Sequence, residues 1–304
     1  MNGKPVLLGD TAEFLDERYA GQARDVAELG GGDWSRAFSL RLAGRDLVAR
    51  FGLHGEDFAQ DQRAMAFAGP DLPVPEVLET GLALGGAYAI SQRCYGVFLE
   101  TLDEAGWRRL LPALLRALDT LRQLPAPAPA GGSWREWLWS GLDDRPGERV
   151  SGWRAILAGQ PGLSDLFATA QRAFSGLLDA CPEIRHVLHL DLLNRNVLVA
   201  PDASRLTAVF DWACLAYGDF LYEAAWFTFW APWHAGLAAI DFRSVIRGHY
   251  AATGVDVARF GERLRCYELH IGLTHLAYCA FAGRDDDLRA VAQRTRELLG
   301  PATP

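Results

Sequence analysis

A short polar turn between two apolar runs constrains this chain more than any other feature of its sequence. The stretch HLDLLNRNVLV, residues 189–199, gathers His189, Asp191, Asn194, Arg195 and Asn196 between valines and leucines. Polar groups are costly to place in an apolar neighbourhood unless each has a partner or a task. So many of them in one short turn indicate a site.

The residues that follow this turn predict a β-hairpin. Residues 196–200 and 206–210 are both strand-like, and a turn-forming PDASR segment separates them. Asp211 comes directly after the second run. In an antiparallel pair, Asn196 and Asp211 meet at the open end, with Asp191 in the loop leading in. We therefore expect these three side chains to converge.

Two carboxylates and a carboxamide are hard oxygen ligands, which suit Mg²⁺ held partly by substrate phosphates. A carboxylate that does not bind the metal can accept a hydroxyl proton. Together these are the functional groups that phosphoryl transfer needs, because its catalysis is mostly positioning and charge neutralisation. The alternative is structural: Asp191 and Asn196 cap a turn, as such residues often do, and His189 is a core histidine.

Charge and composition narrow the class of partner. The formal net charge is -8, which disfavours nucleic acid and suits a cationic small molecule, although acidic surfaces also serve solubility. The five cysteines include no CxxC pair, which argues against a disulfide framework or a zinc site. Without a long apolar run or a signal-peptide pattern, we expect a cytoplasmic monomer with no membrane contact.

The pattern along the chain predicts an α+β protein with two lobes. Residues 1–92 form a small β-rich lobe, and residues 93–304 form a larger, mostly helical lobe interrupted by the hairpin. In the small lobe, strands are expected at 37–42, 47–51 and 88–92, with helices at 10–20 and 56–68. In the large lobe, a leucine-rich helix follows Trp107, and further helices are expected at 134–141, 163–180, 219–230, 241–252, 256–282 and 286–299.

Several stretches resemble a known family. HLDLLNRN resembles the catalytic loop of kinase-like enzymes, and VFDWACLAYGD resembles the metal-binding segment of the aminoglycoside phosphotransferases. SRAFSL, LPVPEVLETG, CPEIRH, TAVFDW, YGDFLYE and FWAPW occur in that family's order and at similar spacing, so the resemblance covers most of the chain. It implies a protein-kinase-like fold that binds ATP between two lobes.

The resemblance also implies roles for the polar turn. Asp191 is then the catalytic base for the acceptor hydroxyl, Asn196 and Asp211 hold Mg²⁺, and His189 supports the loop. In the small lobe, GGGDWSRAFSL occupies the place of the family's phosphate loop, with the candidate residues Gly31, Gly32 and Ser35. Glycines allow backbone N–H groups to approach phosphates closely.

The strand at 47–51 carries Arg50 where kinases usually have a lysine. Arginine keeps the positive charge and adds a fork that matches phosphate. Asp61 falls on the inward stripe of its predicted helix and is the expected partner of Arg50, although an exposed or capping Asp61 is the alternative. By the same resemblance, backbone groups around Gln92, Arg93 and Cys94 meet the adenine.

A cationic amino-sugar acceptor needs acidic walls and aromatic faces. The candidates are Trp230 and Trp233 in FWAPW, with Asp219 and Glu223 nearby in sequence. Ordinary core aromatics and solvated helix acids are the alternatives. Leu190 replaces the family's common glycine after histidine, which leaves the identity of the antibiotic open.

The expected activity is ATP-dependent O-phosphorylation of an aminoglycoside hydroxyl, with hygromycin B as the first candidate and antibiotic resistance as the result. One alternative is a related small-molecule kinase for a macrolide, an amino alcohol or a sugar metabolite. A second alternative is a nucleotide-binding pseudokinase, suggested by the replaced lysine.

Overall fold

The computed structural model describes residues 6–127 and 132–300. Contacts divide the chain into two compact units. The first unit contains the chain up to Leu102 together with Gly106–Thr120 and Asp191–Leu215. The second contains Asp103–Ala105, Leu121–Leu190 and the chain from Ala216 onward. The division differs from the expected boundary at residue 92, because the polar turn and its hairpin pack with the N-terminal part of the chain.

The first unit is built on a five-stranded antiparallel sheet of order β1-β2-β3-β5-β4. Its elements are α1 (Leu8–Arg18), β1 (Arg24–Gly31), β2 (Ser35–Leu42), β3 (Arg45–Gly52), α2 (Gly55–Ala64), β4 (Val77–Ala83) and β5 (Gly86–Gln92). The predicted strands and helices are confirmed here. Strands β1 and β4, which are the two edge strands, were not predicted. An edge strand is partly exposed, so its sequence lacks the clear alternation of a central strand.

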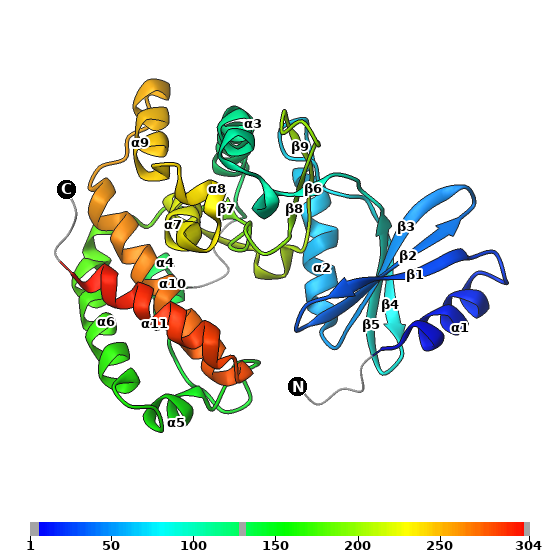
Figure 1. The fold of residues 1–304 in the computed structure, drawn as a ribbon, viewed down its shortest axis with the longest axis horizontal. Coiled ribbons are helices and arrows are strands. Elements are labelled where there is room, and N and C mark those ends of the chain that lie inside the picture. The colour runs from blue at the N-terminus through cyan, green and yellow to red at the C-terminus, as the bar shows by residue number, and fades with distance from the viewer. Residues whose placement is uncertain (1–5, 128–131, 301–304) are drawn as a thin grey trace. The chain divides into compact units, whose positions relative to one another are not determined.

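Helices α1 and α2 cover opposite faces of this sheet (Figure 1). Leu15 of α1 belongs to a buried cluster with Tyr88, whereas Phe58 of α2 packs with Ala87. Tyr88 and Ala87 are neighbours on β5, and successive side chains of a strand point to opposite faces. The sheet is therefore covered on both sides, and α2 is held firmly enough to present a side chain to the site.

A second, three-stranded sheet in the first unit carries the polar turn. Its strand order is β6-β8-β9, with bounds Val97–Phe98, Val197–Val199 and Leu206–Val209. The β8–β9 pair is antiparallel, with Val197 opposite Val209. The predicted hairpin is confirmed.

The second unit is mostly helical. Its elements are α4 (Trp134–Ser140), α5 (Trp153–Ala158), α6 (Leu163–Leu177), β7 (His186–Leu188), β10 (Ala216–Gly218), α7 (Leu221–Trp230), α8 (Ala235–Ala238), α9 (Phe242–Thr253), α10 (Phe260–Ala282) and α11 (Asp285–Leu299). The predicted helices all exist, whereas the short α5 and α8 were not predicted. Helix α3 (Glu104–Gln123) contributes to both units, and the loop predicted at 126–132 falls mostly outside the described residues.

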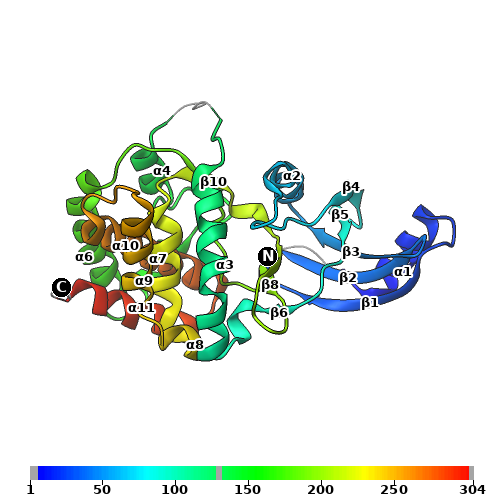
Figure 2. The ribbon, with the colours of Figure 1, turned by 90° about the horizontal axis from the view of Figure 1, so that it is seen from above.

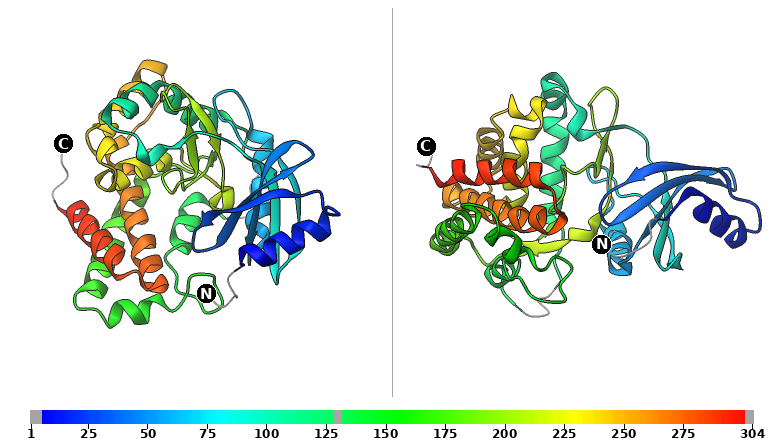
Figure 3. Two further views of the ribbon diagram at one scale, coloured as in Figure 1. Left: turned by 45° about the vertical axis from the view of Figure 1, so that its right-hand side comes forward. Right: turned by 60° about the horizontal axis from the view of Figure 1, so that its bottom comes forward.

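Helix α10 is the core of the second unit. It packs against α5, α6, α7 and α11, and Figures 2 and 3 show α6 and α11 running beside it. Fifteen of its 23 residues are buried, including charged ones such as Arg263 and Glu268. A helix that is buried nearly all round is typical of a core position. Within the described residues, none of the helices combines the length and apolar character needed to cross a bilayer.

Candidate active site

The hairpin brings the predicted site residues to one end. Asn196 directly precedes β8, and Asp211 follows β9 after Phe210. The Phe210 N–H donates to the Asn196 carbonyl at 3.0 Å, which continues the ladder to the point where both polar side chains leave it. Asn196 is buried, with 4% of its surface exposed, whereas the Asp211 side chain is 38% exposed.

Asp191 is held by the amides that follow it in the loop. The Asn196 Nδ2 donates to the Asp191 carbonyl at 2.8 Å and to its Oδ2 at 3.0 Å. The Asn194 Nδ2 donates to the same Oδ2 at 3.2 Å. Convergence of Asp191 and Asn196 is thus observed, and Asn194 joins them. Asn194 belongs to the polar turn, but its position in the sequence predicted no role for it.

Burial raises the pKa of Asp191 to about 8. The amide donors of Asn194 and Asn196 oppose this shift, while the negative charges of Asp211 and Glu100 add to it. A carboxylate whose pKa lies near neutral pH is suited to take a proton in a transition state. The shift is consistent with the predicted role of Asp191 as a general base.

The predicted partnership of Arg50 and Asp61 is present. The Arg50 guanidinium forms an ion pair with the Asp61 carboxylate, and its Nη1 lies 3.6 Å from Asp211 Oδ2. Asp61 is buried, with 5% of its surface exposed. Its Oδ1 also accepts a hydrogen bond from the backbone N–H of Trp212 at 2.8 Å. Asp61 therefore connects β3, α2 and the segment that carries Asp211.

Three residues of this region have left-handed backbone conformations. The φ angles are 66° at Leu190, 60° at Arg195 and 61° at Asp211. Positive φ is uncommon for residues other than glycine, and such residues gather at functional sites. The Leu190 that replaces the family's glycine thus keeps a glycine-like conformation, so the substitution leaves the turn in place.

Glu100 holds the backbone at Arg195, and the sequence did not predict this role. Its carboxylate accepts the Arg195 N–H at 2.6 Å. Burial raises the pKa of Glu100, although the Arg195 N–H favours the charged form. An isolated acid after β6 carries no motif, so only the fold reveals that it reaches the polar turn.

The glycine loop connects β1 to β2. The Gly32 N–H donates to the Ser35 carbonyl at 3.1 Å, which closes the loop tightly. A Cβ at Gly31 would lie 2.6 Å from the Ser35 oxygen, whereas a Cβ at Gly32 would meet nothing within 4 Å. Gly31 is therefore required by sterics, and a side chain there would distort the loop.

The expected hinge follows β5. Hydrogen bonds to Glu76 and Asp46 already engage the N–H groups of Gln92 and Arg93. Any backbone hydrogen bond from these two residues to adenine would therefore use their carbonyl oxygens. Cys94 is partly buried, and burial raises the pKa of its thiol.

The structure gives Asp219 and Glu223 partners inside the helical unit, which corrects their expected role as acceptor ligands. Asp219 is fully buried and pairs with Arg263, whose Nη2 lies 2.6 Å from its Oδ1. Glu223 Oε1 accepts the N–H of His189 at 2.5 Å and that of Leu190 at 2.9 Å. Neither carboxylate is exposed to a ligand. Sequence reasoning failed here because an acid on a helix does not reveal which face is buried.

Glu223 instead supports the start of the polar turn. Burial raises its pKa to about 7, against the effect of the two N–H donors from Leu190 and His189. Glu223 holds the peptide N–H groups of His189 and Leu190, which precede Asp191, and so helps to position Asp191.

Trp230 and Trp233 lie in an aromatic cluster at the end of α7. Their rings are 4.9 Å apart in an edge-to-face arrangement, and Trp230 also contacts His275 and Trp226. Trp226 and Trp230 have buried indole N–H groups that find no acceptor within the described part of the chain. Trp233 is 37% exposed. It borders a hollow of about 220 Å³ that is lined by Pro232, Trp233, Ala290, Gln293, Arg294 and Glu297.

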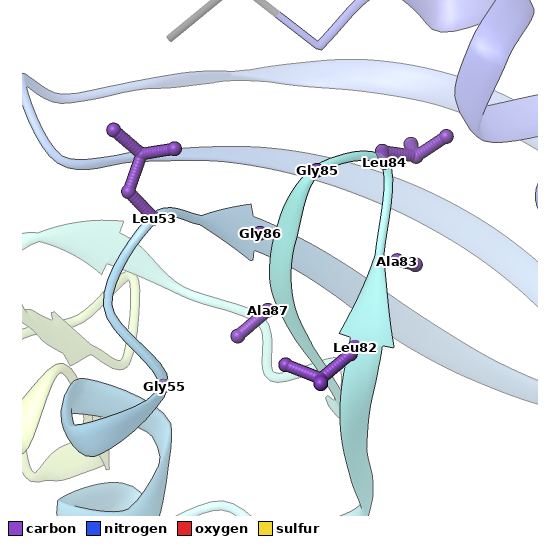
Figure 4. Close-up of a pocket in the computed structure, with 8 residues that line it drawn as sticks. All are labelled: Leu53, Gly55, Leu82, Ala83, Leu84, Gly85, Gly86 and Ala87. Carbon is purple, nitrogen blue, oxygen red and sulfur yellow. The ribbon is translucent and has the colours of Figure 1, made fainter. Parts of the chain in front are cut away.

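Another hollow, of about 480 Å³, lies at the β4–β5 turn of the first unit (Figure 4). It is lined by glycines, alanines and leucines, of which Leu82 is 86% exposed. None of the predicted site residues and no charged side chain lines it.

The donor set fits Mg²⁺ only if other ligands complete it. Asn196 directs its Nδ2 towards Asp191, so its carboxamide oxygen is the atom it could offer to a metal, and Asp211 has a partly exposed carboxylate. No group of three or more acidic, histidine or cysteine side chains suited to a metal occurs in residues 6–127 and 132–300. One or two protein ligands completed by phosphates is the usual arrangement for Mg²⁺.

Comparisons with known proteins agree with this geometry. The model of the phosphotransferase enzyme family matches residues 25–253. The chain is 32% identical to the hygromycin-B 4-O-kinase of Escherichia coli over 302 residues, covering 93% of this chain and 83% of that protein.

Solved structures show the same likeness. The crystal structure of the aminoglycoside phosphotransferase APH(4)-Ia superposes with a TM-score of 0.82 at 29% identity, covering 96% of this chain and 98% of that one. A thermostable mutant of APH(4)-Ia, in ternary complex with AMP-PNP and hygromycin B, gives a TM-score of 0.80 at 29% identity, with coverage of 94% and 97%. The α+β, kinase-like fold is confirmed, and the chain belongs to the phosphotransferase enzyme family.

Proposed function

We propose that this protein transfers the γ-phosphoryl group of ATP to a hydroxyl of an aminoglycoside, with hygromycin B as the first candidate, and thereby confers antibiotic resistance. The observation that carries the proposal is the gathering of Asp191, Asn196, Asp211 and Arg50 within one compact unit. The similarity to a hygromycin-B 4-O-kinase over nearly the whole chain supports the choice of acceptor.

The nucleotide is assigned to the first unit. We assign the phosphates to the glycine loop and to Arg50, which Asp61 orients, and the adenine to the strand end that follows β5. The residues in this assignment are Gly31, Gly32, Ser35, Arg50, Asp61, Gln92 and Cys94. Arg50 is suited to the phosphates because its guanidinium stays charged and its fork matches phosphate oxygens.

Asp191 acts as the base in the proposed reaction. The acceptor hydroxyl gives its proton to the Asp191 carboxylate while its oxygen forms a bond to the γ-phosphorus. The bond from that phosphorus to the β,γ-bridging oxygen breaks, and ADP leaves with the electron pair. Asn196 and Asp211 would hold Mg²⁺, which supplies charge neutralisation at the phosphate oxygens when bound.

The acceptor is assigned to the tryptophans of the second unit. The face of Trp233 is exposed enough to stack on a sugar ring, and Trp230 supports it through the edge-to-face contact between their rings. A net charge of -8 would attract a polycationic amino-sugar. Asp219 and Glu223 are left out because each already has protein partners.

A coupled ADP-release assay tests the proposal. Hygromycin B is tried first, followed by other aminoglycosides, a macrolide and an amino alcohol, with Asp191→Ala as the inactive control. We expect ADP release that depends on an aminoglycoside and disappears in the variant. Turnover of another alcohol alone would indicate a different small-molecule kinase. Nucleotide binding without any turnover would indicate a regulatory protein and refute the proposed activity.

A further inference from the structure

We propose that Asn194 is a positioning residue for Asp191: its carboxamide, together with that of Asn196, fixes the rotation of the base's carboxylate. The inference rests on the proposed phosphotransferase function. It adds a residue to which the family resemblance gave no role.

The geometry of the two amides carries the inference. Asn194 and Asn196 both direct an Nδ2 donor to Oδ2 of Asp191, at 3.2 Å and 3.0 Å. Two donors on one oxygen fix the plane of a carboxylate more firmly than one does. Rotation of the Asp191 carboxylate is thereby restricted.

The backbone between the two amides explains why both reach the same oxygen. Arg195 separates them and has a φ of 60°, a left-handed conformation that is unfavourable for arginine. Its N–H is held by the Glu100 carboxylate at 2.6 Å. Glu100 lies in the short 3-10 helix Leu99–Thr101 that follows β6, and β6 pairs with β8, the strand that follows the turn. The turn that presents Asn194 is thus held by the segment that follows a neighbouring strand.

Asn194 is exposed, which separates a positioning role from a structural one. Exposed side chains contribute little to stability when they are substituted. A variant at this position should therefore fold normally. Any loss of turnover then reports on the orientation of Asp191 rather than on the integrity of the fold.

The test compares Asn194→Leu, which removes the donor at similar size, with Asn194→Gln, which keeps an amide donor. Gln123→Leu, at the exposed end of α3, is the matched control. With the acceptor that the wild type phosphorylates, we expect Asn194→Leu to lower kcat roughly ten- to hundredfold and to change neither KM by more than about twofold. Asn194→Gln should recover most of the loss, and the control should match the wild type.

Crystal structures of the wild type and Asn194→Leu with ADP give a readout that needs no acceptor. The Asp191 carboxylate should be rotated in the variant relative to the wild type. Unchanged kcat or an unrotated carboxylate would overturn the inference. If the wild type turned over no acceptor, the proposed function would fail, and the two crystal structures would still decide the role of Asn194.

Discussion

The carboxylate of Asp61 accepts a hydrogen bond from the backbone N–H of Trp212, 2.8 Å away, although 151 residues separate them in the chain. The same carboxylate forms an ion pair with Arg50. One buried acid on α2 therefore determines both the direction of the guanidinium and the path of the chain directly after Asp211. The Arg50 and Asp211 groups proposed for nucleotide and metal depend on this single side chain.

Replacing Asp61 should destabilise the protein and weaken nucleotide binding together. In Asp61→Leu, the Arg50 side chain, which is 15% exposed, would lose its main partner. Removing one member of a buried pair costs about 3 kcal/mol or more. Asp61→Asn keeps an acceptor for the Trp212 N–H and should lose less. Urea denaturation and a nucleotide titration measure both effects, and equal stability of the two variants would contradict the dual role of Asp61.

Substitutions of Asp191 and Asp211 should have different effects on turnover and on nucleotide binding. Asp191→Ala should abolish most turnover with little change in nucleotide affinity, because a general base chiefly lowers the free energy of the transition state. Asp211→Ala should also weaken binding of the metal–nucleotide complex. Measuring kcat and the nucleotide Kd for both variants checks the division. If the two variants behaved alike, the assignment of separate roles would be wrong.

The glycine loop offers a matched pair of substitutions. A methyl group at Gly31 would lie 2.6 Å from the Ser35 oxygen, whereas Gly32 has open space around it. We therefore expect Gly31→Ala to raise the KM for ATP by roughly tenfold, which corresponds to about 1.4 kcal/mol of lost binding. Gly32→Ala should have a smaller effect. A larger effect at Gly32 would show that steric closure of the loop is not the reason for the first glycine.

Glu223 should make stability depend on pH. Burial raises its pKa in the folded protein from 4.5 to about 7, so the folded state holds this proton more tightly than the unfolded state. Stability should therefore fall as the pH rises from about 4.5 to about 7, by at most about 3 kcal/mol from this group.

Glu223→Gln keeps an oxygen acceptor for the N–H groups of His189 and Leu190 but cannot titrate. Thermal melts at several pH values should therefore show a shallower decline in this variant than in the wild type. Glu13→Gln, which changes an exposed carboxylate, serves as the control and should follow the wild type. An identical decline in Glu223→Gln would rule out this group as the source.

Trp233 should matter for the acceptor and not for ATP. It is 37% exposed, as is Trp139 on α4, which provides a control of equal exposure. We expect Trp233→Ala to raise the KM for the aminoglycoside by roughly tenfold, equivalent to about 1.4 kcal/mol, while the KM for ATP stays the same. Trp139→Ala should change neither constant. An unchanged acceptor KM in Trp233→Ala would place the sugar elsewhere.

The central part of the fold was predictable from local pattern. The alternation of Phe38, Leu40 and Leu42 predicted β2. As expected, β2 pairs with β3 in an antiparallel hairpin. The edge strands β1 and β4 were missed because they are only partly buried. The short α5 and α8 were also missed, since a helix of four to six residues has too few turns for its apolar period to show.

The sequence by itself determined that Asn196 and Asp211 lie at the same end of one hairpin, because a hairpin's register follows from its own strands and turn. Only the tertiary structure decided what surrounds them. It placed Asp61 in a hydrogen bond with Trp212 and Glu100 in a hydrogen bond with Arg195. It also buried Glu223, whose carboxylate accepts the N–H of His189 and is not exposed to an acceptor. The physical reason is range: strand period and turn chemistry are local, whereas the partner of a buried acid depends on how distant elements pack together.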